Sequence, residues 1–168
     1  SIWGPWFSEP YLDFFMTIYK KRFFNIQGLN PPRHFGYVGN AITQLESLMN
    51  APVADIQGRV FYLADYDVYH VVDWAHAIAK RLGGRRSPPH SIPYTLAAFA
   101  ALVGDVLKAC GWKKPPLTSF RLKNMAADTS SVDLSPTKGV CPALPYSIDQ
   151  GVERTVEWMS AESLIRPL

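Results

Sequence analysis

The stretch Arg59-Val60-Phe61-Tyr62-Leu63-Ala64 is a nearly continuous run of strand-forming residues. An uninterrupted run of this kind is typical of a strand that is covered on both faces, as in a parallel sheet. The flanking segments do not supply the rest of that sheet, because most of them carry the 3.6-residue apolar period of helices. Strands and helices do not alternate regularly along the chain, and this excludes a free-standing doubly wound sheet.

Helices are predicted on both sides of this run from apolar spacing, caps and Gly or Pro stops. The clearest start is Ser147, which is followed by Asp149 and Gln150 in the first helical turn. The predicted helices cover residues 9–22, 40–50, 71–82, 94–110, 118–124 and 147–158, and the predicted strands cover 23–26, 35–38, 59–64 and 130–133. The expected fold class is α+β and mainly helical, with a few short strands.

Composition narrows the class of protein further. The chain has 168 residues, enough for about one domain, and its 48% hydrophobic content against 18% charged residues excludes wholesale disorder. Seventeen basic and fourteen acidic residues leave a net charge of +3, and the basic residues form small scattered groups. This pattern predicts no nucleic-acid partner. The longest apolar run covers residues 96–103, far short of the roughly 20 residues that span a bilayer, so we expect a buried helix and no membrane span.

The cysteines and the N-terminus suggest a compartment and an origin. Cys110 and Cys141 are too few for a disulfide framework, which favours a cytoplasmic location. Residues 1–5 lack the features of a signal peptide and an initiating methionine, so we expect a portion of a longer protein. The spacing of the four histidines predicts no metal site, and no G-x-S-x-G element is present.

Two features are candidates for ligand binding. Arg33 follows two prolines in a loop, from which a guanidinium can bind a phosphate with two parallel hydrogen bonds, although a surface arginine is the simpler interpretation. The aromatic cluster Trp3-Gly4-Pro5-Trp6-Phe7 is either a local hydrophobic plug or the wall of a ligand pocket. Composition does not separate these interpretations.

Four segments carry a family resemblance when they are taken in order. Residues 1–5 (S-I-W-G-P) are similar to the end of an R-x-x-N-x-Y-G-P signature, and residues 33–40 (R-H-F-G-Y-V-G-N) to R-D-F-V-Y-V-D-D or its V-D-N form. Residues 58–65 (G-R-V-F-Y-L-A-D) are similar to G-x-x-Y-N-x-G/D, and residues 132–158 to a D-x-S-K-A, P-x-x-S-L-E-E-G, T-V-x-W ending. Together they resemble the C-terminal half of the extended short-chain dehydrogenase/reductases, the NAD-dependent epimerase/dehydratase family.

The resemblance implies that residues 1–168 are the C-terminal substrate-binding region of an NAD(P)-dependent epimerase/dehydratase whose N-terminal Rossmann part is absent. The family performs hydride transfer at a sugar secondary alcohol, with NAD or NADP as cofactor. Its G-x-x-G-x-x-G turn and Tyr-x-x-x-Lys pair do not occur in this sequence. We therefore assign no catalytic residue, expect no cofactor on this chain alone and expect the chain by itself to be inactive.

The resemblance also assigns binding roles. Arg33 is expected to hold the diphosphate of a nucleotide-sugar substrate, with Arg121 as a second phosphate ligand because Thr129 stands where related enzymes have an arginine. The expected lining of the pocket near the nicotinamide is Ser1, Trp3, Gly4 and Pro5, of which Gly4 and Pro5 also contact the cofactor.

Two alternatives to a nucleotide-sugar enzyme stay open. Asn40 and the apolar helix from Tyr94 are similar to the 3β-hydroxysteroid-dehydrogenase-like branch, which implies a reductase of a hydrophobic alcohol. A stand-alone, non-catalytic binding module is the third hypothesis. The resemblance leaves a homodimer of the intact enzyme open, and it implies the missing Rossmann half as a partner.

Overall fold

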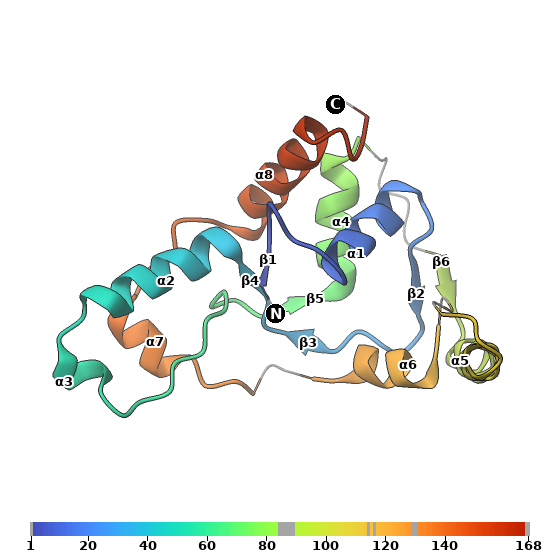
Figure 1. Cartoon of the computed structure of the whole chain (residues 1–168), viewed down its shortest axis with the longest axis horizontal. Helices are drawn as coiled ribbons and strands as arrows, with labels where there is room; N and C mark the ends of the chain where they lie inside the picture. Colours follow the sequence, from blue (N-terminus) through green and yellow to red (C-terminus); the bar gives the residue numbers. More distant parts are fainter. Residues whose placement is uncertain (1, 84–89, 114, 116, 129–130, 167–168) are drawn as a thin grey trace.

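The computed structural model of the chain describes residues 2–83, 90–113, 115, 117–128 and 131–166 (Figure 1). The mainly helical α+β class predicted from the sequence is confirmed. The helices are α1 Tyr11–Tyr19, α2 Val38–Asn50, α3 Val53–Ile56, α4 Val71–Arg81, α5 Tyr94–Ala109, α6 Ser119–Ala126, α7 Ser135–Val140 and α8 Ile148–Ala161. The strands are β1 Ile2–Trp3, β2 Phe24–Ile26, β3 Pro32–Arg33, β4 Gly36–Tyr37, β5 Tyr69–His70 and β6 His90–Ile92.

The strands form three two-stranded sheets. β1 pairs with β4 and β2 pairs with β6, both in parallel, whereas β3 pairs with β5 in the antiparallel sense. Each pair joins segments that are far apart in the sequence, so strand propensity alone does not reveal the pairing.

The larger core lies where β1 and β4 meet α1, α4 and α8. Trp3 is 1% exposed, and its ring centroid lies 5.1 Å from that of Trp74 and 5.2 Å from that of Tyr37. Phe15 of α1 and Val156 of α8 are also fully buried in this core. A second, smaller core joins β2 to α5 and α6 through Ile26, Ala97, Ala101, Leu117 and Leu122.

The strand predicted over residues 59–64 is wrong: these residues form no regular element and pair in no ladder. Two of its carbonyls accept side-chain hydrogen bonds, at Ala64 from Gln44 Nε2 (2.7 Å) and at Tyr62 from Thr137 Oγ1 (2.8 Å). Val60 is 72% exposed and Tyr62 is 54% exposed. The residues have the composition of a sheet-forming strand, but the described residues supply no neighbouring strand to pair with it.

The helix predicted over residues 94–110 forms as α5, but the expectation that it is buried is wrong. Its buried positions are the small residues Ala97, Ala101 and Gly104, while most of its large apolar side chains are exposed. A Cβ atom added at Gly104 would lie 1.8 Å from the carbonyl oxygen of Leu117, so the missing side chain allows this close approach. Within the described part of the chain, no helix is long and apolar enough to cross a membrane.

The remaining differences concern boundaries and short elements. α2 begins two residues before Asn40, and α1 is shorter than the predicted 9–22 helix. Residues 131–133 are not a strand; instead Asp133 Oδ1 accepts a hydrogen bond from the Ser135 backbone N–H (2.9 Å) at the start of α7. Residue 130 lies outside the described residues. α8 begins with the expected capping box, in which Ser147 and Gln150 each bind the other's backbone N–H.

Candidate functional site

Arg33 is held at the junction of β3 and α6. Its backbone lies opposite Tyr69 in the β3–β5 pair, and its Nη2 donates a hydrogen bond to the carbonyl oxygen of Asn124. Asn124 is in the last turn of α6, whose carbonyls carry the negative end of the helix dipole, so a cation is stabilised there. The guanidinium is therefore anchored to a helix that lies 91 residues further along the chain.

The Nε atom of Arg33 is buried and has no hydrogen-bond partner among the described residues. Leaving a buried N–H unpaired costs about 1–3 kcal/mol, and more in a charged group. The fork geometry of arginine matches two oxygens of a carboxylate or phosphate, which would satisfy this donor. Arg33 thus combines a fixed position with an unused donor of the kind that binds an oxyanion.

Arg121 lies on the same helix whose end Arg33 contacts. Its backbone N–H donates to the Thr118 hydroxyl (3.2 Å), which caps the N-terminus of α6 as the sequence predicted. Lys123 adds a further cation to α6, and both basic residues are exposed. Figure 1 shows β3 beside α6. The helix that anchors Arg33 therefore carries two further basic residues.

The segment at the start of the chain is part of the larger hydrophobic core. Trp3 is buried among aromatic rings, and Gly4 has a φ of +143° with Val38 Cγ1 only 2.5 Å from the position of an added Cβ. Pro5 is half-buried, and Ser1 lies outside the described residues. The packing of Trp3 and Gly4 accounts for these residue types, and their roles in a ligand pocket stay predictions.

A buried polar cluster that we did not predict lies behind this segment. Asn40 Nδ2 donates to Asp65 Oδ1 (2.7 Å) and to the Tyr146 carbonyl (2.9 Å), and Asn40 Oδ1 accepts from the Tyr146 backbone N–H (3.1 Å). The Tyr37 backbone N–H also donates to the Asp65 carboxylate (3.2 Å). Burial raises the pKa of Asp65, while the bonds from Asn40 and Tyr37 oppose the rise.

These hydrogen bonds connect Asn40 of α2 to Asp65, which follows the 59–64 segment. They also connect Asn40 to Tyr146, which precedes Ser147, the N-cap of α8. Asn40 uses both its donor group and its acceptor, so its amide is matched to its neighbours. The only sequence signal was that residues 40 and 65 end two of the family-like motifs. Nothing in the local sequence showed that they meet.

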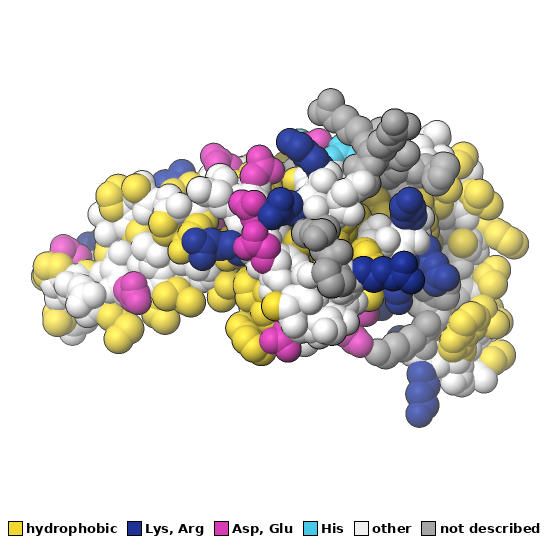
Figure 2. All heavy atoms as spheres, turned by 90° about the horizontal axis from the view of Figure 1, so that it is seen from above, with side chains coloured by type: hydrophobic (Ala, Val, Ile, Leu, Met, Phe, Trp, Pro, Cys, Tyr) yellow, Lys and Arg dark blue, Asp and Glu magenta, His cyan; other side chains and the backbone are white. Residues whose placement is uncertain are grey.

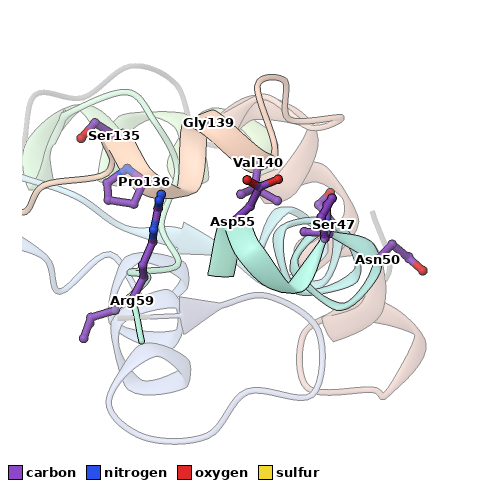
Figure 3. Close-up of a pocket in the computed structure, with 11 residues that line it drawn as sticks. Ser47, Asn50, Asp55, Arg59, Ser135, Pro136, Gly139 and Val140 are labelled. Carbon is purple, nitrogen blue, oxygen red and sulfur yellow. The ribbon is translucent and has the colours of Figure 1, made fainter. Parts of the chain in front are cut away.

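A cavity lies elsewhere, between α2, α3, α7 and the beginning of the 59–64 segment. Its volume is about 990 Å³, and its lining includes Asp55, Arg59 and Ser135 (Figure 3). Arg59 extends along the wall toward Pro136 of α7. None of the binding residues predicted from the sequence lines this cavity. Within the described residues, no group of three or more His, Cys, Asp or Glu side chains is arranged to hold a metal ion.

Comparison with known proteins identifies the fold. No family model and no curated protein matches the chain. Among solved structures, the chain is similar to gox2253, with a TM-score of 0.66 and 13% identity over 99% of this chain and 48% of that one. It is also similar to UDP-glucuronic acid 4-epimerase from Bacillus cereus in complex with UDP-glucuronic acid and NAD, with a TM-score of 0.63 and 12% identity over 98% and 44% of the two chains.

A third similar structure is UDP-glucose 4-epimerase from Thermotoga maritima with UDP-glucose, at a TM-score of 0.60 and 14% identity over 98% of this chain and 45% of that one. The chain therefore spans less than half the length of these structures. The predicted likeness to NAD-dependent epimerases and dehydratases is confirmed for the fold. A cytoplasmic location and a homodimer stay predictions.

Proposed function

We propose that this chain is the substrate-binding part of an NAD(P)-dependent nucleotide-sugar epimerase or dehydratase, and that the hydride-transfer machinery lies on a Rossmann segment outside residues 1–168. The fold supports this proposal, because two of the similar structures were solved with UDP-sugars. The observation that carries it is the buried, unpaired Nε of Arg33 beside the basic helix α6.

In this proposal Arg33 binds the diphosphate of the substrate. Its Nη2 is already held by Asn124, so the guanidinium loses little further freedom when its Nε meets a phosphate oxygen. Arg121, on the same helix, supplies a second positive charge. Of the residues expected on the nicotinamide side, Pro5 is half-buried and is the one proposed for the pocket wall, because Trp3 and Gly4 are packed in the core.

The residues of this chain do not fit a dinucleotide cofactor by themselves. The sequence contains neither the G-x-x-G-x-x-G turn nor a Tyr-x-x-x-Lys pair, and the close packing on Val38 accounts for the absence of a side chain at Gly4. The function proposed for the chain is therefore to bind and orient the substrate, which fixes the position of the reacting sugar.

An exposed apolar face supports the proposed Rossmann partner. Ile42, Leu45 and Met49 follow one face of α2 and are about half exposed or more, and Val60 and Tyr62 are exposed on the unpaired 59–64 segment. Contiguous exposed apolar surface usually marks an interface. The remaining strands of a Rossmann sheet would cover this face and would pair with residues 59–64.

The alternative of a hydrophobic alcohol substrate loses part of its support. It was motivated by the apolar residues 94–103, and several large side chains of this segment, among them Leu96, Phe99 and Leu102, are exposed on the outside of α5. Nothing in the described structure directs them toward Arg33.

Calorimetric titration of the chain with UDP and UDP-glucose tests the proposal. We expect weak binding that Arg33→Ala reduces at least tenfold and Arg33→Lys reduces less, because lysine keeps the charge but not the fork. Arg59→Ala, which removes an arginine from the separate cavity, is the matched control and should bind like the wild type. Equal binding by Arg33→Ala and the wild type would reject the phosphate role, and binding of a sterol in place of UDP would favour the hydrophobic alcohol.

A further inference from the structure

The helix α6 is short and is held mainly at its two ends. Of its eight residues only Leu122 is buried, and a helix of this length is marginal in water without further support. At its C-terminal end the carbonyl oxygen of Asn124 accepts the hydrogen bond from Arg33 Nη2. The position of the Arg33 guanidinium therefore depends on whether the last turn of α6 is formed.

Two side chains hold the N-terminal end of α6. The hydroxyl of Thr118, which is buried, accepts a hydrogen bond from the Arg121 backbone N–H (3.2 Å). The backbone N–H of Ser119 donates to both carboxylate oxygens of Asp105 on α5, to Oδ1 at 3.2 Å and to Oδ2 at 3.3 Å. A negative charge at the N-terminus and a positive charge at the C-terminus both stabilise a helix dipole. Asp105 and Arg33 therefore stabilise opposite ends of the same helix.

Arg33 connects the two hydrophobic cores. Its backbone pairs with Tyr69, which packs against the larger core. Its side chain binds α6, whose Leu122 belongs to the smaller core together with Ala97 and Ala101 of α5. Figure 1 shows α5 at one edge of the molecule with α6 beside it, and Figure 2 shows that edge from above, lined with hydrophobic side chains. Because the two cores consist of different buried residues, a movement of α6 would also move the anchor of the guanidinium.

We propose that α6 positions Arg33, and that Asp105 and Thr118 act through α6 to raise the affinity of this arginine for a phosphate group. Thr118 and Asn124 are six residues apart, so the two ends of α6 lie about 9 Å from each other. While the caps keep α6 helical, the Asn124 carbonyl holds Nη2 in place and the unpaired Nε is available to a phosphate oxygen. This inference rests on the proposed function, in which Arg33 binds the diphosphate of a nucleotide sugar.

Calorimetric titration of the full chain with UDP tests the positioning role. We expect Thr118→Ala and Asp105→Ala each to weaken binding about threefold or more, because each lowers the fraction of chains in which α6 is formed. Thr118→Ser keeps a capping hydroxyl and should bind like the wild type. The matched control is Ser147→Ala, which removes the N-cap hydroxyl of α8. The Arg33 side chain binds α6 and not α8, so this control should keep its UDP affinity.

Hydrogen exchange gives a second measurement, which a general loss of stability would not reproduce. Coupling between two sites is reciprocal, so UDP bound at Arg33 must in turn stabilise α6. We expect UDP to slow amide exchange in residues 119–126 of the wild type and to leave exchange in α8 unchanged. At the same UDP concentration, Arg33→Ala should show no such protection. Circular dichroism checks that each variant is folded.

The outcomes separate this inference from the proposed function. If Arg33→Ala loses UDP binding but Thr118→Ala and Asp105→Ala bind as tightly as the wild type, the positioning role is overturned and the phosphate role of Arg33 stands. Equal weakening by Ser147→Ala would indicate a general loss of stability and would also overturn the positioning role. If the wild type does not bind UDP, or if Arg33→Ala binds it equally well, the phosphate role and this inference are both rejected.

Discussion

Replacing Asn40 with alanine should destabilise this chain strongly, because the side chain is 1% exposed and is fully used. The substitution removes one hydrogen bond to the Asp65 carboxylate and two to the backbone of Tyr146. A bond to a charged group contributes about 1.5–3 kcal/mol and a neutral one about 1 kcal/mol. We therefore expect the free energy of unfolding to fall by about 4 kcal/mol near neutral pH.

The penalty should also depend on pH. The bond from Asn40 lowers the pKa of Asp65, so its loss raises that pKa further above the unfolded value. Between the two values the folded state binds the extra proton, and stability therefore increases as the pH falls through the raised folded pKa. The destabilisation by Asn40→Ala should be smaller at acidic than at neutral pH.

Urea denaturation followed by tryptophan fluorescence measures both effects, since Trp3 and Trp74 are buried in the folded chain. Thr43→Ala is the matched control on the same helix, because it removes a single half-buried bond to the Gly39 carbonyl and should cost about 1 kcal/mol or less. A loss for Asn40→Ala no larger than that of Thr43→Ala, or one that does not change with pH, would refute this account of the cluster.

Three further predictions concern Asp65 of the same cluster, the close contact at Gly104 and the exposed face of α2. The wild type should become more stable as the pH falls through the raised pKa of Asp65, and Asp65→Asn should lose this gain. Urea midpoints measured at several pH values test this, and an Asp65→Asn variant with the wild-type pH profile would contradict it. Gly104→Ala should lower the melting temperature by several degrees, because its Cβ would meet the Leu117 carbonyl, whereas Gly139→Ala faces open space and should not; equal melting of the two variants would exclude the close contact. The wild-type chain should self-associate through the exposed face of α2, and Ile42→Glu/Leu45→Glu should shift it toward the monomer in light scattering, so unchanged association would mean that another surface is responsible.

The sequence by itself determined the features that depend on neighbouring residues. Thr118 and Ser147 cap α6 and α8 as predicted, because a capping hydrogen bond closes within three residues. The mainly helical class and the likeness to epimerases and dehydratases also followed from local patterns taken in order. The candidate role of Arg33 came from its residue type and from that likeness.

Only the tertiary structure decided which side of each element is buried and which distant residues it contacts. The apolar run in α5 predicted a helix, but the close approach at Gly104 places the alanines inside and leaves Phe99 outside. Residues 59–64 have strand propensity, yet propensity supplies no partner, and Gln44 and Thr137 bind their carbonyls instead. Asn40 meets Asp65, and Arg33 meets Asn124, across separations of 25 and 91 residues, because packing brings together groups that no short-range period relates.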